Sequence, residues 1–119
     1  MVRAVRGAIQ VDQDEPADIL AGTRELLTEV VLRNGIVSTD LISIVFTLTP
    51  DLTSCFPATA ARDLGLVDVP LLCATEVAVP GALPRVIRLL AHIESDRPRS
   101  AVRHVYLRGA TQLRPDLAA

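Results

Sequence analysis

The sequence predicts an α+β protein, with a small mixed β-sheet packed against helices. Short apolar runs rich in β-branched residues recur at strand length, and two segments between them have helical periodicity. A length of 119 residues suits one domain. Half the residues are hydrophobic and 22% are charged, so the chain can bury a core. We therefore expect a single domain over residues 1–119, with five strands and two or three helices.

The N-terminal third predicts a strand followed by a long helix. Val2–Val11 alternates apolar residues with arginines, which is typical of a strand. An acidic loop containing Pro16 leads into Ala17–Arg33, where apolar residues recur at helical spacing. Asn34-Gly35 is a typical helix end, because glycine readily adopts the left-handed conformation.

The middle of the chain predicts a strand, a short helix and a second strand. Leu41–Leu48 is a β-branched run that Thr49-Pro50-Asp51 interrupts. Pro57 suits the first position of a helix, which small apolar residues continue as far as Gly65. Val69–Thr75 then predicts the third strand.

The C-terminal third predicts two further strands. Val86–Glu94 fits a long strand, although its apolar residues also fit a helical period. After a polar turn at Asp96–Ser100, Val102–Leu107 predicts the fifth strand. For the tail, about residues 109–119, we expect a partly extended and partly mobile segment.

The charged residues exclude several classes of function. All 12 basic residues are arginine, so lysine Schiff-base chemistry and a P-loop are excluded. A net charge of −2 leaves no basic field for nucleic acid. The planar guanidinium binds carboxylates through two parallel hydrogen bonds, which suits a small dianionic substrate. A GC-rich genome would give the same arginine bias without any function.

The cysteines and histidines predict no metal site. Cys55 and Cys73 are 18 residues apart, and His92 and His104 have no ligand spacing. No signal peptide and no apolar run of spanning length is evident in the sequence. We expect a cytoplasmic protein with reduced thiols and no membrane partner.

Few residues suggest covalent catalysis. Cys73 with His104 could form a nucleophile and base, although a buried thiol and a hydrogen-bonded imidazole explain both without catalysis. Charges within strands are more informative, because a buried charge must reach solvent, a carboxylate or a ligand. An enzyme built from such residues would act by positioning and fixed charge. The candidates are Arg6, Arg88, Arg103, Glu76 and Tyr106.

Seven short motifs are spread nearly end to end along the chain. They are Val5-Arg6-Gly7-Ala8, Thr49-Pro50-Asp51-Leu52, Phe56-Pro57-Ala58, Cys73 followed by Glu76, Arg88 in its apolar strand, His104-Val105-Tyr106-Leu107 and Leu113-Arg114-Pro115-Asp116-Leu117. In this order and spacing, they closely resemble the AroH-class chorismate mutases.

The resemblance implies a homotrimer with a pseudo-α/β barrel and active sites between adjacent subunits. Half of the residues in this small chain are hydrophobic, which independently favours oligomerisation. The implied reaction is the Claisen rearrangement of chorismate to prephenate, in phenylalanine and tyrosine biosynthesis. It needs no cofactor, metal or covalent intermediate.

The resemblance also implies a role for each site residue. Arg88 would place a fixed cation beside the ether oxygen, where negative charge develops in the transition state. Arg6 and Tyr106 would bind the side-chain carboxylate, and Glu76 with Cys73 would contact the ring hydroxyl. Further substrate contacts are implied for Phe56, Ala58, Arg62, Leu72, Leu113 and Arg114.

Two positions depart from the family pattern. Thr59 stands where the family often has a basic residue, and Leu72 stands where a hydroxyl side chain is common. Loss of a charge at the rim should raise KM more than it lowers kcat. An alternative is a non-catalytic trimeric protein that binds a small carboxylate or has a regulatory role. A trimeric imine or enamine deaminase of similar architecture is a further alternative.

Overall fold

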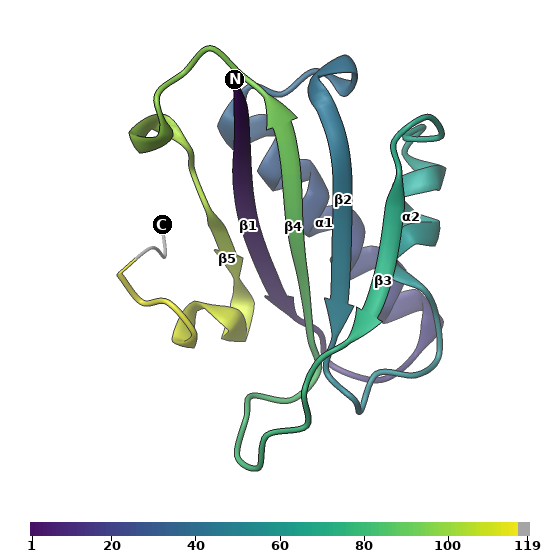
Figure 1. Ribbon diagram of the computed structural model, residues 1–119. Coiled ribbons are helices and arrows are strands. Elements are labelled where there is room, and N and C mark those ends of the chain that lie inside the picture. Colours follow the sequence, from purple (N-terminus) through teal and green to yellow (C-terminus); the bar gives the residue numbers. More distant parts are fainter. Residues whose placement is uncertain (117–119) are drawn as a thin grey trace.

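The computed structural model describes residues 1–116, which form a five-stranded mixed sheet with two α-helices on one face (Figure 1). The predicted α+β class is therefore confirmed. The elements are β1 (Val2–Gln10), α1 (Pro16–Asn34), η1 (Ser38–Asp40), β2 (Leu41–Leu48), α2 (Pro57–Asp63), β3 (Leu71–Thr75), β4 (Val86–Glu94), η2 (Arg99–Ala101), β5 (Val105–Leu107) and η3 (Arg108–Gln112).

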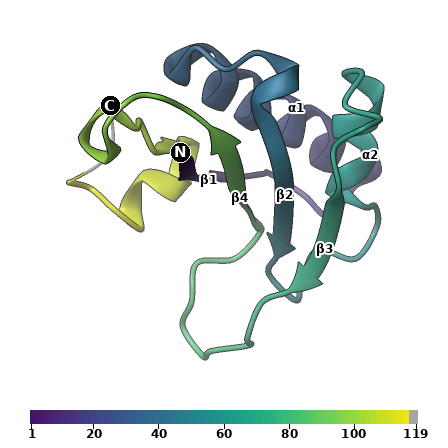
Figure 2. The same cartoon turned by 45° about the horizontal axis from the view of Figure 1, so that its top comes forward.

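The strand order is β3-β2-β4-β1-β5. The central strand β4 runs antiparallel to both of its neighbours, β1 and β2. The edge strands β3 and β5 run parallel to β2 and β1, respectively. Figure 2 shows α1 and α2 on the same side of this sheet, so the other side carries no α-helix of the described chain.

Helix α1 begins and ends where its local sequence requires. Pro16 occupies the first turn, where its missing N–H is not needed. Gly35 follows the last residue with φ 60°, a left-handed conformation that favours glycine. The helix packs closely on the sheet, because a Cβ at Gly22 would lie 2.5 Å from Val11 Cγ1. Its buried apolar residues recur at helical spacing: Ile19, Leu26, Leu27 and Val30.

Residues 86–94 form a strand, which resolves the ambiguity of their sequence pattern. Alternate residues from Ile87 to Ile93 are buried against the helices, whereas Arg88, Leu90 and His92 alternate with them. Arg88 and its same-side neighbours therefore lie on the face without α-helices, which we call the open face.

Part of the open face is covered by a second, small apolar cluster. It contains Ala8 of β1, Val86 of β4, Tyr106 of β5 and Ala110 of η3, all buried. Leu83 and Leu113 pack against it. The segment before β4 and the C-terminal turn thus cover one end of the open face.

Two predicted strands begin later than expected. Residue 69 lies in a bend and residue 70 has no regular secondary structure, so β3 starts at Leu71 and not at Val69. β5 starts at Val105 and not at Val102, because the backbone of Arg103 is bonded elsewhere. Its N–H donates to Asn34 Oδ1 at 2.8 Å, and its carbonyl accepts from Asn34 Nδ2 at 2.9 Å.

The tail differs from the expected extended segment. Residues 108–112 form the 3₁₀ turn η3, and Leu113 N donates to Ala110 O. Residues 117–119, which include Leu117 of the last motif, lie outside the described residues. Within residues 1–116, no helix has the length and apolar character needed to cross a membrane.

Candidate active site

A cavity of about 390 Å³ lies on the open face and brings several predicted residues together. Five of them come from four parts of the chain: β1, β4, β5 and the segment after η3. The lining residues are Arg6, Gly7, Val45, Thr47, Arg88, Leu89, Leu90, Tyr106, Leu113 and Arg114.

Arg88 is held by a carboxylate beside this cavity. Its Nε lies 3.0 Å from Glu76 Oε2, and its side chain is 44% exposed in the single chain. Within residues 1–116 the guanidinium donates no hydrogen bond, so its N–H groups remain available to other groups. Arg88 is thus a cation held by Glu76, and its guanidinium still has N–H groups that can donate to a ligand.

Glu76 follows β3 and extends the sheet by one further bond. Its N–H donates to Leu48 O at 2.8 Å, which places the residue beside the end of β2. Its carboxylate is 18% exposed and accepts from the Thr47 hydroxyl at 2.6 Å. Of the three partners expected for a strand charge, which were solvent, a carboxylate and a ligand, Arg88 contacts a carboxylate and remains partly open to solvent.

Arg6 lies on the open face of β1, two positions before Ala8, which pairs with Arg88. In the described part of the chain its guanidinium forms no salt bridge. Its backbone N–H donates to His104 Nδ1 at 3.0 Å. Partial burial lowers the pKa of His104, and the charges of Arg6 and Arg114 lower it further. A neutral imidazole fits this acceptor role, so His104 has a structural role beside the cavity.

Arg114 forms the outer wall and is paired within the tail. Its Nε and one terminal nitrogen lie 3.2 and 3.0 Å from the two oxygens of Asp116. This two-point contact is the first cause of a lowered pKa of Asp116 and of a raised pKa of Arg114.

Phe56 and Cys73 line a second cavity, of about 350 Å³, near the end of β3. The Phe56 side chain is 70% exposed. The preceding turn is fixed by Asp14, whose carboxylate accepts from Thr53 N and Oγ1 and from Ser54 N. These bonds, the Thr53 N–H first, lower the pKa of Asp14.

Four predicted substrate contacts line neither of these cavities: Glu76, described above, and three others. Ala58 is buried in the main core, Arg62 is exposed on α2, and Leu72 is 62% exposed on β3. Leu72 pairs with Val45 across the parallel ladder, which places it on the open face. Within one chain, therefore, the predicted site is divided between two cavities and the surface.

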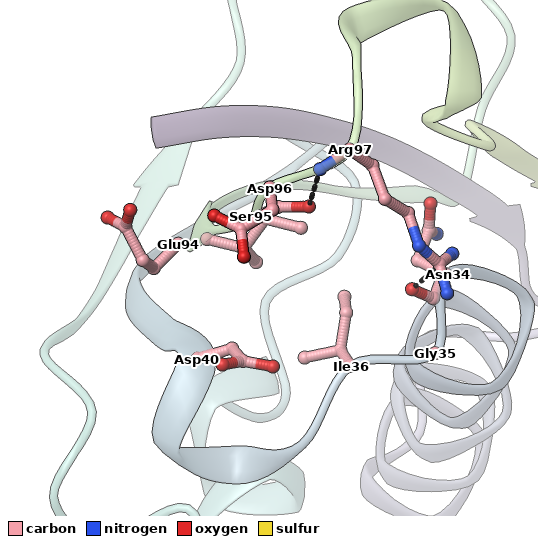
Figure 3. A pocket seen from close by; sticks show the side chains of 9 residues that line it. Asn34, Gly35, Ile36, Asp40, Glu94, Ser95, Asp96 and Arg97 are labelled. Atoms are coloured by element: carbon pink, nitrogen blue, oxygen red, sulfur yellow. Dashed lines mark hydrogen bonds between the residues drawn. The ribbon is translucent and has the colours of Figure 1, made fainter. Parts of the chain in front are cut away.

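A third cavity, of about 310 Å³, lies at the opposite end of β4 from Arg88 (Figure 3). Asn34, Asp40, Glu94 and Arg97 are among its lining residues, and none of them was predicted as functional. Figure 3 shows the Arg97 side chain extending toward Asn34, and its Nη1 donates to Asn34 O at 3.2 Å.

The alternative nucleophile and base are not adjacent in one chain. Cys73 is on β3 and His104 precedes β5, at opposite edges of the sheet. Within residues 1–116, no three histidine, cysteine, aspartate or glutamate side chains are grouped so that they could hold a metal ion.

Sequence reasoning missed several lining residues. Val45, Thr47 and Leu90 lie on the open face because of their register with Arg6 and Arg88. Strand alternation predicts which side chains share a face, but the pairing between β2 and β4 was not evident in the sequence.

The fold and this cavity define a small α+β protein with three arginines around a cavity on the open face of its sheet. The family model described as "Chorismate mutase type I" matches residues 2–117. The chain belongs to this family.

Individual relatives agree over nearly the whole chain. Chorismate mutase AroH of Thermus thermophilus is 58% identical over 118 residues, which are 98% of this chain and 97% of that protein. Chorismate mutase AroH of Bacillus subtilis (strain 168) is 39% identical over 119 residues, 99% of this chain and 94% of that protein.

A solved structure confirms the fold. Chorismate mutase from Clostridium thermocellum Cth-682 superimposes with a TM-score of 0.91 at 42% identity, over 92% of this chain and 97% of that chain. The protein is thus an enzyme of the isomerase class, with the chorismate mutase fold that its motifs resembled.

Proposed function

We propose that this protein converts chorismate to prephenate by fixed charge and positioning, a step in aromatic amino-acid biosynthesis. The observation that carries the proposal is the Arg88–Glu76 pair beside a cavity that Arg6 and Tyr106 also line. Family membership supplies the substrate, and the cavity supplies cations for its two carboxylates.

The rearrangement requires no atom beyond those of the substrate. The ether C–O bond breaks, a C–C bond forms, and electron pairs shift around the six reacting atoms without loss or gain of a proton. Bond breaking runs ahead of bond formation, so negative charge develops on the ether oxygen. A terminal N–H of Arg88 directed at this oxygen stabilises the transition state more than the substrate.

The neighbouring residues restrict the substrate to its reactive conformer. Arg6 and Tyr106 bind the side-chain carboxylate and hold the enolpyruvyl arm over the ring. Glu76 accepts a hydrogen bond from the ring hydroxyl and favours the positive charge that develops on the ring. Leu113 and Arg114 close the outer wall.

We propose that the active enzyme is a homotrimer with its sites between adjacent copies. Apolar residues remain exposed on the open face, including Leu72 and Leu90. Phe56 and Cys73 line a cavity separate from that of Arg88 in one chain. A neighbouring copy that places the exposed Phe56 ring over Arg88 would exclude water and complete the site.

We further propose a cytoplasmic location. The two cysteines are free thiols, which suits a reducing compartment.

The direct test is to mix purified protein with chorismate and follow the loss of its diene absorbance. We expect loss well above the uncatalysed rate, together with a trimer mass in sedimentation equilibrium. If chorismate binds but no loss above the uncatalysed rate occurs, the protein is a carboxylate-binding protein and the proposal is wrong.

A further inference from the structure

We propose that Thr47 is a positioning residue, which holds Glu76 so that one carboxylate oxygen anchors Arg88 while the other remains for the substrate. This inference deepens the proposed function and rests on it for its kinetic test.

Thr47 is the neighbour that Arg88 and Glu76 share. It pairs with Arg88 across the antiparallel β2–β4 ladder, and both side chains line the cavity on the open face. On the other side of β2, Glu76 N bonds to Leu48 O, directly after Thr47. The three residues therefore come from three adjacent segments of the sheet.

A hydrogen bond from Thr47 and an ion pair with Arg88 meet at the same oxygen of Glu76. The Thr47 hydroxyl lies 2.6 Å from Oε2, and Arg88 Nε lies 3.0 Å from the same atom. Among residues 1–116, no hydrogen bond reaches Oε1. Oε2 thus carries the Thr47 hydrogen bond and the Arg88 ion pair, and Oε1 is the atom available to a substrate hydroxyl.

The short hydroxyl bond restricts a pair that is otherwise free to move. Arg88 is 44% exposed in the single chain, and an arginine loses much rotamer entropy when it is held in one geometry. A hydroxyl that donates to a charged oxygen forms a stronger bond than one between neutral groups. Thr47 thus fixes the Glu76 rotamer, and Glu76 fixes the position from which Arg88 acts.

The kinetic test compares Thr47→Val with Thr47→Ser. Valine keeps the shape but has no donor, so we expect kcat to fall about tenfold, as for loss of one hydrogen bond to a charged group. KM should change less than about threefold, because positioning acts on the transition state. Serine should restore kcat. Ser43→Ala is the matched control, since Ser43 is a hydroxyl residue of β2 that does not line the cavity.

A double-variant cycle tests whether Thr47 acts through Glu76. In a Glu76→Gln background, Thr47→Val should cause little further loss of kcat, because the carboxylate that it orients is absent. Full additivity of the two losses, a wild-type kcat for Thr47→Val or a failure of serine to restore kcat would overturn the proposal.

A second readout does not depend on turnover. The ¹⁵Nε–H resonance of Arg88, assigned by its absence in Arg88→Ala, should exchange faster with water in Thr47→Val than in Thr47→Ser or Ser43→Ala. Equal exchange in all three variants would refute the positioning role. If wild-type protein does not act on chorismate, the proposed function fails while this measurement still decides the role of Thr47.

Discussion

The two ends of strand β4 carry cavities of similar size that hold their arginines in different ways. Beside the cavity of about 390 Å³, Arg88 forms an ion pair with Glu76, with its Nε 3.0 Å from Oε2. At the cavity of about 310 Å³, Arg97 is tied to the fold from several sides. Its Nη1 donates to Asn34 O, its N–H donates to Ser95 Oγ, and its carbonyl accepts from Arg3 Nε.

The difference shows that cavity volume does not identify the site. Arg97 and the buried Asn34 side chain bond mainly to backbone groups of this chain, so their polar capacity is used by the fold. Arg88 keeps its terminal nitrogens, and Arg6 beside it has no salt bridge among the described residues. Under the proposed function, the anionic substrate binds where the fold leaves donors unused.

The largest expected effect comes from replacing the arginine of each cavity. Arg88→Ala should reduce kcat by about 10² to 10³, because it removes a preorganised cation from the transition state. Arg97→Ala is the matched control, and should lower Tm by about 4 °C while kcat stays at its wild-type value. The diene assay and a thermal melt measure the two effects.

An Arg88→Ala variant that turns over chorismate at a near wild-type rate would refute its assigned role. Equal losses of kcat in both variants would remove the distinction between the two cavities.

A smaller effect is expected for Arg6, the second arginine of the open-face cavity. Arg6→Ala should reduce kcat/KM by about 10- to 100-fold, because it removes a charge-assisted contact to the substrate carboxylate. Arg3→Ala is the control on the same strand, since Arg3 bonds to Arg97 O away from the site. Steady-state kinetics at several substrate concentrations provide the measurement, and equal losses for both variants would contradict this role.

Thr59, where the family often has a basic residue, allows a gain in substrate affinity to be tested. Thr59→Lys introduces a basic residue at a half-buried position on α2 near Phe56. We expect KM to fall about threefold at low salt with kcat unchanged, because a rim charge acts similarly on substrate and transition state. If KM stays unchanged, Thr59 does not lie at the rim of the assembled site.

The smallest effect concerns pH. The pKa of His104 is lowered in the folded chain, mainly by burial, so the unfolded chain binds more protons below the ordinary pKa of 6.5. Stability should therefore fall as pH decreases from about 6.5 and stay level above it. His104→Asn, which keeps an acceptor for Arg6 N–H, should show a weaker dependence of Tm on pH.

The kcat of the folded enzyme should not change with pH near neutrality, because no proton is transferred in the rearrangement. A bell-shaped dependence of kcat on pH would contradict this mechanism.

The sequence alone predicts the structure correctly where neighbouring residues in the chain determine the backbone conformation. Pro16, Gly35 and Pro57 set helix ends that their residue types predict. Alternation along residues 86–94 places Arg88 on the face away from the core once the segment is a strand.

The sequence alone does not predict the structure where a residue bonds to a partner that is distant in the chain. Asn34 delays the start of the fifth strand from Val102 to Val105, because it bonds to the backbone of Arg103, 69 residues away. Thr47 meets Glu76 and Arg88 only through the sheet register, which no local pattern records. The division of the predicted site between two cavities likewise depends on which faces pack together.

A structure of the assembled enzyme with a bicyclic mimic of the transition state tests the role of Arg88 most directly. We predict a terminal nitrogen of Arg88 about 2.7 to 3.1 Å from the bridging ether oxygen, with Nε still paired to Glu76. An Arg88 side chain directed away from that oxygen, with the mimic bound in the cavity, would contradict the account.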